Sequence, residues 1–327
     1  MIDIQTYLHA FTHLHTATNR THWSAATCHR APNKPLLLLT VIDLFAQGLI
    51  TTNLIEPSDD LIDLFGLYWA LVMPLDRRGN LAMPFFHLRS EGFWHLLPQP
   101  GQAAALAAIK SISALSQLYE LLLGAKVDDE LYALLCTNDG REQLRTALID
   151  TYFAPDLHAP LHAQAVTNQA AFQYSLTLVE EAKCGKRLQE PLIPYTIIPP
   201  TVRDQGFRRA VVTAYTHRCA FCGIRMRTPD GHTVVDAAHI IPWSVSHNDD
   251  PRNGLALCRL CHWTFDEGLL GVSHHYQVIA TKALTAYGNI AGHLLTLHER
   301  PIFQPVEAAL WPDRDALRWH RAECLRS

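Results

Sequence analysis

The segment VVDAAHIIPW, residues 234–243, places an acidic side chain and an imidazole inside an apolar run typical of a β-strand. Burying such groups costs free energy unless a partner or a ligand satisfies them. Two Cys-x-x-Cys pairs bracket the segment, CAFC before it and CRLC after it. Thiolates, an acid and histidines gathered in this way indicate a metal-supported site in this part of the chain.

The two cysteine pairs have the spacing of a structural zinc site. Cys-x-x-Cys forms a tight turn in which two thiolates face one ion, and tetrahedral zinc takes four such ligands. We therefore predict a structural Zn²⁺ that joins the two turns. Redox-active or merely buried thiols are the alternative, although a redox motif of the thioredoxin type needs a single pair. The predicted ligands are Cys219, Cys222, Cys258 and Cys261.

The remaining chemistry-bearing side chains suit hydrolysis of a phosphodiester bond, which needs a deprotonated water and positive charge at the phosphate. A neutral imidazole, with an ordinary pKa of about 6.5, accepts a proton at neutral pH, so His239 is the predicted general base. A divalent ion stabilises the leaving oxygen, and His262 is a predicted ligand of that ion. Considered without their neighbours, His239 is typical of a histidine in a protein core, and Asn253-Gly254 is typical of a turn.

The order Asp236, His239, Asn253, His262, with cysteine pairs around it, resembles the HNH (His-Me finger) nucleases over about residues 203–327. The resemblance implies a β-hairpin followed by a helix that together grip one catalytic ion, Mg²⁺ or Mn²⁺. It also implies that Asn253 is a site residue that holds the backbone or the His239 ring in place.

This chain departs from the family pattern directly before the base. Many members carry Asp or His there as a metal ligand, where this chain has Ala238. Because side chains alternate along a strand, Asp236 shares a face with residue 238 and is the predicted second ligand, with a supporting or capping role as its alternative. Asp266 and His247 are expected to be surface or capping groups.

The chain is expected to fold as an α+β protein of two domains. NKPLLLLTVIDLFAQG, SDDLIDLFGLYWALV and GQAAALAAIKSISALSQLYELLLG are each typical of a helix, and PFFHLRSEGFWHLL of a β-hairpin. The proline-rich PLIPYTIIPP cannot form a regular helix and marks a break. We predict a mainly helical domain over residues 1–165, a linker over 166–195, and a zinc-stapled ββα domain over 196–327.

Within the first domain, HRAPNKPLLLLTVIDLFAQG and MPFFHLRSEGFWHL resemble the N-terminal sulphur-binding domain of phosphorothioate-dependent type IV restriction endonucleases, which place an HNH domain second. The resemblance implies that residues 1–165 read double-stranded DNA carrying sulphur in place of a phosphate oxygen. A shallow apolar cup suits the poorly hydrated sulphur, and arginine supplies charge for the phosphate. The predicted DNA-binding and sulphur-binding residues are Arg30, Met83, Pro84, Phe85 and Arg89, with Met83 standing where the family often has Tyr.

Composition narrows the other function classes. The net charge of −4 does not by itself indicate a nucleic-acid-binding protein. The charge of the whole chain does not, however, determine the charge of one local cleft. No run of about 18 apolar residues is present, and the N-terminus lacks the order of a signal peptide, so a cytoplasmic protein without a membrane span is expected. Cleavage of both strands by a chain with one site favours a homodimer.

Three alternatives remain open at this point. The enzyme acts on unmodified or differently modified DNA, or the C-terminal half is a zinc-ribbon DNA-binding module without catalysis, or the N-terminal half binds a protein or a small second messenger. A zinc-ribbon binder gains nothing from His239, Asn253 and His262, which favours the enzyme.

Overall fold

The computed structural model describes residues 4–185, 198–228, 232–286 and 288–326. The chain divides into two compact units. Unit 1 comprises Met1–Gln169 with Thr228–His232, and unit 2 comprises Ala170–Arg227 with Thr233–Ser327. The division at residue 169 falls within the predicted linker 166–195, of which residues 186–195 lie outside the described part. Helix α9 (Pro155–Lys183) continues through the division, so residues 166–183 of that linker are helical.

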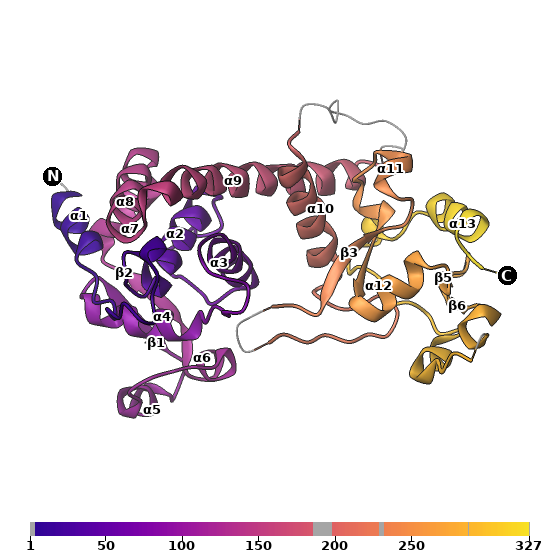
Figure 1. Cartoon of the computed structure of the whole chain (residues 1–327), viewed down its shortest axis with the longest axis horizontal. Coiled ribbons are helices and arrows are strands. Elements are labelled where there is room, and N and C mark those ends of the chain that lie inside the picture. Colours follow the sequence, from indigo (N-terminus) through magenta and orange to yellow (C-terminus); the bar gives the residue numbers. More distant parts are fainter. Residues whose placement is uncertain (1–3, 186–197, 229–231, 287, 327) are drawn as a thin grey trace. The chain divides into compact units, whose positions relative to one another are not determined.

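Unit 1 is mainly helical, and one antiparallel pair of strands, β1 (Trp94–Pro98) and β2 (Leu122–Val127), completes it (Figure 1). The strands pair with Trp94 opposite Val127. The helices before α9 are α1 (Ile4–Thr12), α2 (Asn33–Ala46), α3 (Asp59–Val72), α4 (Ala82–His87), α5 (Ala103–Ala108), α6 (Leu115–Leu121), α7 (Asp129–Cys136) and α8 (Asn138–Tyr152).

Helix α2 lies at the centre of the unit 1 core. Every residue from Asn33 to Phe45 is buried, as expected for a helix that is apolar on nearly all sides. Its buried polar residues include Asp43, whose carboxylate has partners at 2.7–2.8 Å from three surrounding elements. A buried charge persists when its hydrogen bonds are satisfied in this way. The partners are Tyr68, Arg145 and Asn168.

Two predictions for unit 1 are wrong. PFFH does not open a hairpin but belongs to α4, while the later strand β1 pairs with the distant β2. Pro84 falls in the first turn of α4, where its missing N–H needs no partner, and the Asn80 side chain accepts the N–H of Met83 at 3.1 Å. The alanine-rich stretch forms two short helices instead of one, because residues 109–114 between α5 and α6 are not helical. Serine and β-branched isoleucine in that stretch favour such a break.

The predicted helices at α2 and α3 are confirmed. Ser58 caps α3, since its side chain accepts the N–H of Leu61 at 3.3 Å. None of the helices in the described ranges is long and apolar enough to cross a bilayer.

Unit 2 is built around the antiparallel hairpin of β3 (Val235–His239) and β4 (Gly254–Cys258), which is followed directly by α12 (Arg259–Asp266) (Figure 1). This is the predicted ββα order, and the chain is α+β as expected. Helices α10 (Pro200–Ala214) and α12 both pack against the hairpin, and β4 is buried along its whole length. The remaining helices and strands are α11 (Trp243–Ser246), β5 (Leu270–Val272), β6 (Val278–Ala280) and α13 (Arg314–Glu323).

Candidate active site

The four predicted zinc ligands converge. Their Sγ atoms all lie within 4.8 Å of one another, and within the described ranges they are the one group of three or more His, Cys, Asp or Glu side chains so placed. Zn–S bonds of about 2.3 Å in a tetrahedron place the sulphurs about 3.8 Å apart, whereas a disulfide brings them to about 2.05 Å. Cys222 Sγ and Cys258 Sγ are 3.8 Å apart, so the cluster fits a zinc ion.

Local backbone geometry presents these thiols. The first cysteine pair follows α10, where the N–H of Gly223 donates to the carbonyl of Cys219 at 3.0 Å. Gly223 has φ +72°, and a Cβ there would lie 2.4 Å from the Phe303 ring, so glycine is required at this turn. The N–H of Ala220 donates to the carbonyl of Ala256 at 2.7 Å, which attaches the turn to β4. The cluster therefore fastens the hairpin to the start of α12.

His239 is the last residue of β3, and its imidazole lies flat on the Phe207 ring of α10. The ring centroids are 3.9 Å apart and the planes differ by 7°. The Nε2–H group donates to Oδ1 of Asp249 at 2.9 Å. About a fifth of the side chain, 21%, is exposed. The predicted base is thus held on two sides and still accessible.

The carboxylate that holds His239 is buried and was not found from the sequence. The Asp249 side chain is 1% exposed, and its second oxygen accepts the Tyr174 hydroxyl at 3.1 Å. Nε of Arg203 lies 3.7 Å from the same oxygen. Asp249 stands in SHNDDP, a polar stretch that reads as a loop, and nothing in that pattern signals a buried acid. Only the spatial position of His239 identifies it.

Asn253 ties down the loop that joins β3 to β4. Its side chain is buried, its Oδ1 accepts the N–H of Ile241 at 2.9 Å, and its Nδ2 donates to the carbonyls of Ile241 and Asn248 at 3.1 Å. Of the two placements that the family resemblance implies, these bonds correspond to the one in which the amide holds backbone. Because the loop also carries Asp249, Asn253 supports the base indirectly.

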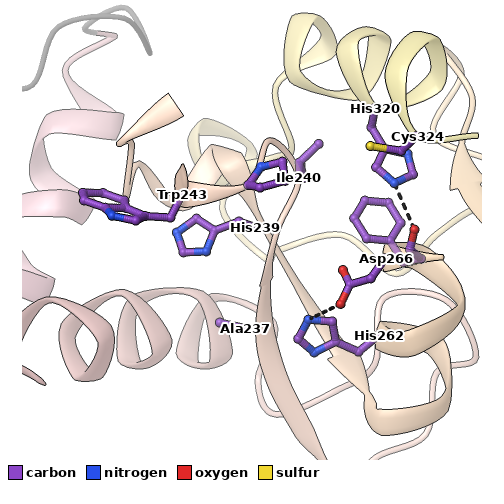
Figure 2. A pocket seen from close by; sticks show the side chains of 10 residues that line it. Ala237, His239, Ile240, Trp243, His262, Asp266, His320 and Cys324 are labelled. Carbon is purple, nitrogen blue, oxygen red and sulfur yellow. Dashed lines mark hydrogen bonds and ion pairs between the residues drawn. The ribbon is translucent and has the colours of Figure 1, made fainter. Parts of the chain in front are cut away.

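His239 and His262 line the same open pocket, of about 330 Å³. Figure 2 shows His239 and Trp243 on one side of the strand that carries Ala237, and His262 with Asp266 on the other side. The predicted base and the predicted ligand thus line one pocket from the two sides of β3. His320 and Cys324 of the C-terminal segment complete the side of the pocket next to Asp266.

The acidic partner of His262 in this pocket is Asp266. Its Oδ2 lies 3.4 Å from Nε2 of His262, one helical turn away on α12. Asp236, the acid favoured by the sequence, does not line the pocket; its side chain is 62% exposed and accepts from Nε of Arg208 at 3.0 Å. Asp266 was expected to be a surface or capping group. Its side chain is exposed, and it also lines the pocket.

His320 of α13 supports α12 from behind. Its ring stacks on Phe265 with centroids 3.8 Å apart, and its Nε2–H donates to the Phe265 carbonyl at 3.1 Å. Burial lowers the pKa of His320 to about 4, so the ring is neutral at neutral pH. Helix α13 therefore packs on the element that carries His262.

The predicted reader residues of unit 1 differ in exposure. Met83 is 41% exposed on α4, and Arg89 is exposed with its guanidinium 3.9 Å from the Phe86 ring centroid. Pro84 is buried, and the fully buried Phe85 packs edge-on against Trp94, so both support α4 from within. Arg30 is half-buried, with its guanidinium 5.8 Å from the ring centroid of Tyr152.

Comparison with known families decides the class of the hairpin and helix. Residues 219–273 match the family described as HNH endonuclease. Residues 219–273 form an HNH endonuclease domain. This domain contains both cysteine pairs together with His239, Asn253 and His262. The match therefore spans the β3–β4 hairpin, α12 and the predicted site residues.

Among the solved structures that are similar to part of the chain is the "Modification dependent TagI restriction endonuclease". The two sequences are 25% identical over the matched region, and the TM-score is 0.30. The match covers 42% of this chain and 45% of that chain, so less than half of the similar protein is represented. No curated protein matches the chain.

Proposed function

We propose that the protein is a DNA endonuclease whose HNH domain cuts DNA that unit 1 has selected by a phosphorothioate in its backbone. The observation that carries the nuclease part is the shared pocket of His239 and His262 inside the HNH domain. The selection of sulphur rests on the resemblance of unit 1 to sulphur-binding domains.

In the proposed reaction, His239 takes a proton from the water that attacks the phosphorus. Phe207 and Asp249 keep the imidazole in one orientation, so the ring does not have to reorient during the reaction. Mg²⁺ or Mn²⁺ at His262 supplies positive charge to the phosphate and to the leaving oxygen. We assign Asp266 as the acidic residue beside this ion in preference to Asp236, because Asp266 lines the pocket and Asp236 is engaged by Arg208.

The zinc ion has a structural role in this proposal. Four thiolates fill a tetrahedral site and leave no position open for water or substrate. The cluster instead fixes the start of α12 relative to β4, and this sets the position of His262. Loss of zinc is therefore expected to abolish activity through the fold.

The proposed reader surface of unit 1 is smaller than the sequence indicates. Met83 offers an exposed, polarisable side chain of the kind that suits sulphur, and Arg89 offers positive charge six residues further along. Pro84 and Phe85 act by holding α4 in place. Arg30 is a second candidate phosphate ligand.

The deciding experiment compares matched plasmids with and without phosphorothioates, incubated with the full chain and Mg²⁺ or Mn²⁺. Cleavage confined to the sulphur-containing plasmid supports the whole proposal. Equal cleavage of both plasmids supports an HNH endonuclease without sulphur selection. Absence of cleavage of either plasmid, with both of them bound, supports the non-catalytic DNA-binding alternative. A homodimer would supply one site for each strand, and sedimentation on the substrate tests that part.

A further inference from the structure

Asp249 is a buried acid in the loop that joins β3 to β4. Its side chain is 1% exposed, and removing a carboxylate from water is costly unless hydrogen bonds and opposite charge compensate. Compensation comes from three residues on three elements. They are His239 of β3 at 2.9 Å, Tyr174 of α9 at 3.1 Å and Arg203 of α10 at 3.7 Å.

The bond between Asp249 and His239 has a chemical consequence. An ionised carboxylate can only accept hydrogen bonds, so the proton of a neutral His239 ring must sit on Nε2. The other ring nitrogen, Nδ1, then carries the free lone pair. Across the described residues, Nδ1 has no hydrogen-bond partner, and it is the ring nitrogen able to accept a proton.

We infer that Asp249 and Tyr174 are positioning residues that hold His239 as the Nε2–H tautomer, which makes Nδ1 the atom that receives the proton of the attacking water. The catalytic role of Nδ1 rests on the proposed function. The tautomer itself does not, because it follows from the buried contacts alone.

Each neighbour limits a different freedom of the pair. Phe207 lies parallel to the imidazole and restricts its tilt, while Asp249 restricts its rotation within that plane. The hydroxyl of Tyr174 fixes the second carboxylate oxygen, so Asp249 cannot turn away from the ring. Burial and the negative charge of Asp249 raise the pKa of Tyr174, so its hydroxyl keeps the proton that it donates.

Arg203 supplies the positive charge next to this carboxylate. Its guanidinium lies over the Trp243 ring at 3.6 Å, and it also pairs with Asp204. These contacts keep Nε of Arg203 at 3.7 Å from Asp249 without a tight ion pair that would compete with His239. The carboxylate therefore keeps its shorter contact for the imidazole.

The test measures the tautomer directly. The zinc-loaded full chain, labelled with ¹⁵N in its histidines, is studied near pH 8 by long-range ¹H–¹⁵N correlation, and the His239 signals are assigned by their absence in His239→Gln. The expected result is the Nε2–H pattern in the natural protein. An Nδ1–H pattern would overturn the inference, whatever the variants do.

Two variants and a control extend the test. Asp249→Asn can donate to the ring as well as accept from it, so we expect a mixed or reversed tautomer. Tyr174→Phe is expected to retain Nε2–H with a broader signal. Asp250→Asn alters the neighbouring acid, which binds Arg252 instead, and is expected to leave the His239 pattern unchanged. An unchanged pattern in a folded Asp249→Asn would overturn the positioning role.

Activity measurements separate this inference from the proposed function. If the chain cleaves DNA, Asp249→Asn is expected to lower kcat by about 10²-fold or more with a small change in KM, because ground-state binding of DNA does not use this pair. A loss confined to KM would overturn the positioning role. Nε2–H in a chain that cleaves no DNA would support the positioning of His239 and contradict only the proposed function.

Discussion

His262 and Asp266 lie one helical turn apart on α12, with 3.4 Å between Nε2 of the imidazole and Oδ2 of the carboxylate. Both side chains line the pocket that His239 shares. An imidazole and a carboxylate on one helix face form half of a divalent site that a phosphate and waters can complete. The first prediction tests these two groups as ion ligands.

Replacing Asp266 with Asn is expected to raise the Mg²⁺ or Mn²⁺ concentration needed for half-maximal cleavage by about tenfold, because a negatively charged ligand is lost. His262→Ala is expected to raise it further. Asp236→Asn is the matched control, since Asp236 pairs with Arg208 outside the pocket. The ion dependence of cleavage checks all three. A rise for Asp236→Asn with none for Asp266→Asn would restore the assignment expected from the sequence.

Replacing Cys222 with Ser is expected to remove the zinc and to unfold the HNH domain. The chain should bind one zinc ion, measured by elemental analysis of dialysed protein, and the variant should bind less and be cut rapidly by a protease. Cys184→Ser is the control, because Cys184 is exposed and outside the cluster. A fully folded Cys222→Ser without zinc would show that the domain does not depend on the ion.

The stability of unit 2 should decrease in acid partly through His320. Burial lowers its pKa to about 4, whereas an unfolded chain has an ordinary histidine pKa of about 6.5. The unfolded state therefore binds more protons between these values, so this contribution is complete above pH 6.5 and is lost as the pH falls toward 4.

His320→Phe keeps the stacking on Phe265 but cannot take a proton. We expect the natural protein to lose about 2 kcal/mol more stability than this variant between pH 7 and pH 5. Urea unfolding of both proteins at the two pH values gives the difference, in which changes at other groups cancel. An equal loss in both proteins would show that His320 does not titrate in this way.

The reader surface predicts different effects for its two exposed residues. Met83→Ala is expected to weaken binding to phosphorothioate DNA several-fold and to leave binding to plain DNA unchanged, because only the contact with sulphur is lost. Arg89→Ala is expected to weaken binding to both DNAs. It should also reduce the slope of log affinity against log salt concentration by about one, the change expected for one lost phosphate contact. Binding titrations at two salt concentrations measure this. Equal effects of Met83→Ala on both DNAs would remove Met83 from sulphur recognition.

Features encoded over short sequence distances could be predicted from the sequence. The four-cysteine cluster follows from two local cysteine spacings, and the order of β3, β4 and α12 follows from the motif between them. Caps such as Ser58 depend on residues three positions apart. Such features need no knowledge of the tertiary fold.

Features that depend on burial could not be predicted in the same way. Phe85 and Phe86 are adjacent apolar residues, which does not match the alternation of apolar and polar residues along a half-buried strand. Both are buried, because α4 packs into the core of unit 1. The sequence around Asp249 is typical of an exposed loop. Its contact with His239 forms only because Asn253 holds this loop against the end of β3. Asp266 is the intermediate case, since its position four residues after His262 is visible in the sequence but the pocket is not.

We propose His239 as the base of a metal-dependent DNA endonuclease. The most direct measurement compares single-turnover cleavage of phosphorothioate DNA by the natural chain and by His239→Ala, with equal zinc content and equal DNA binding. The variant is expected to be slower by at least about 10²-fold. Cleavage by His239→Ala at the natural rate would contradict it.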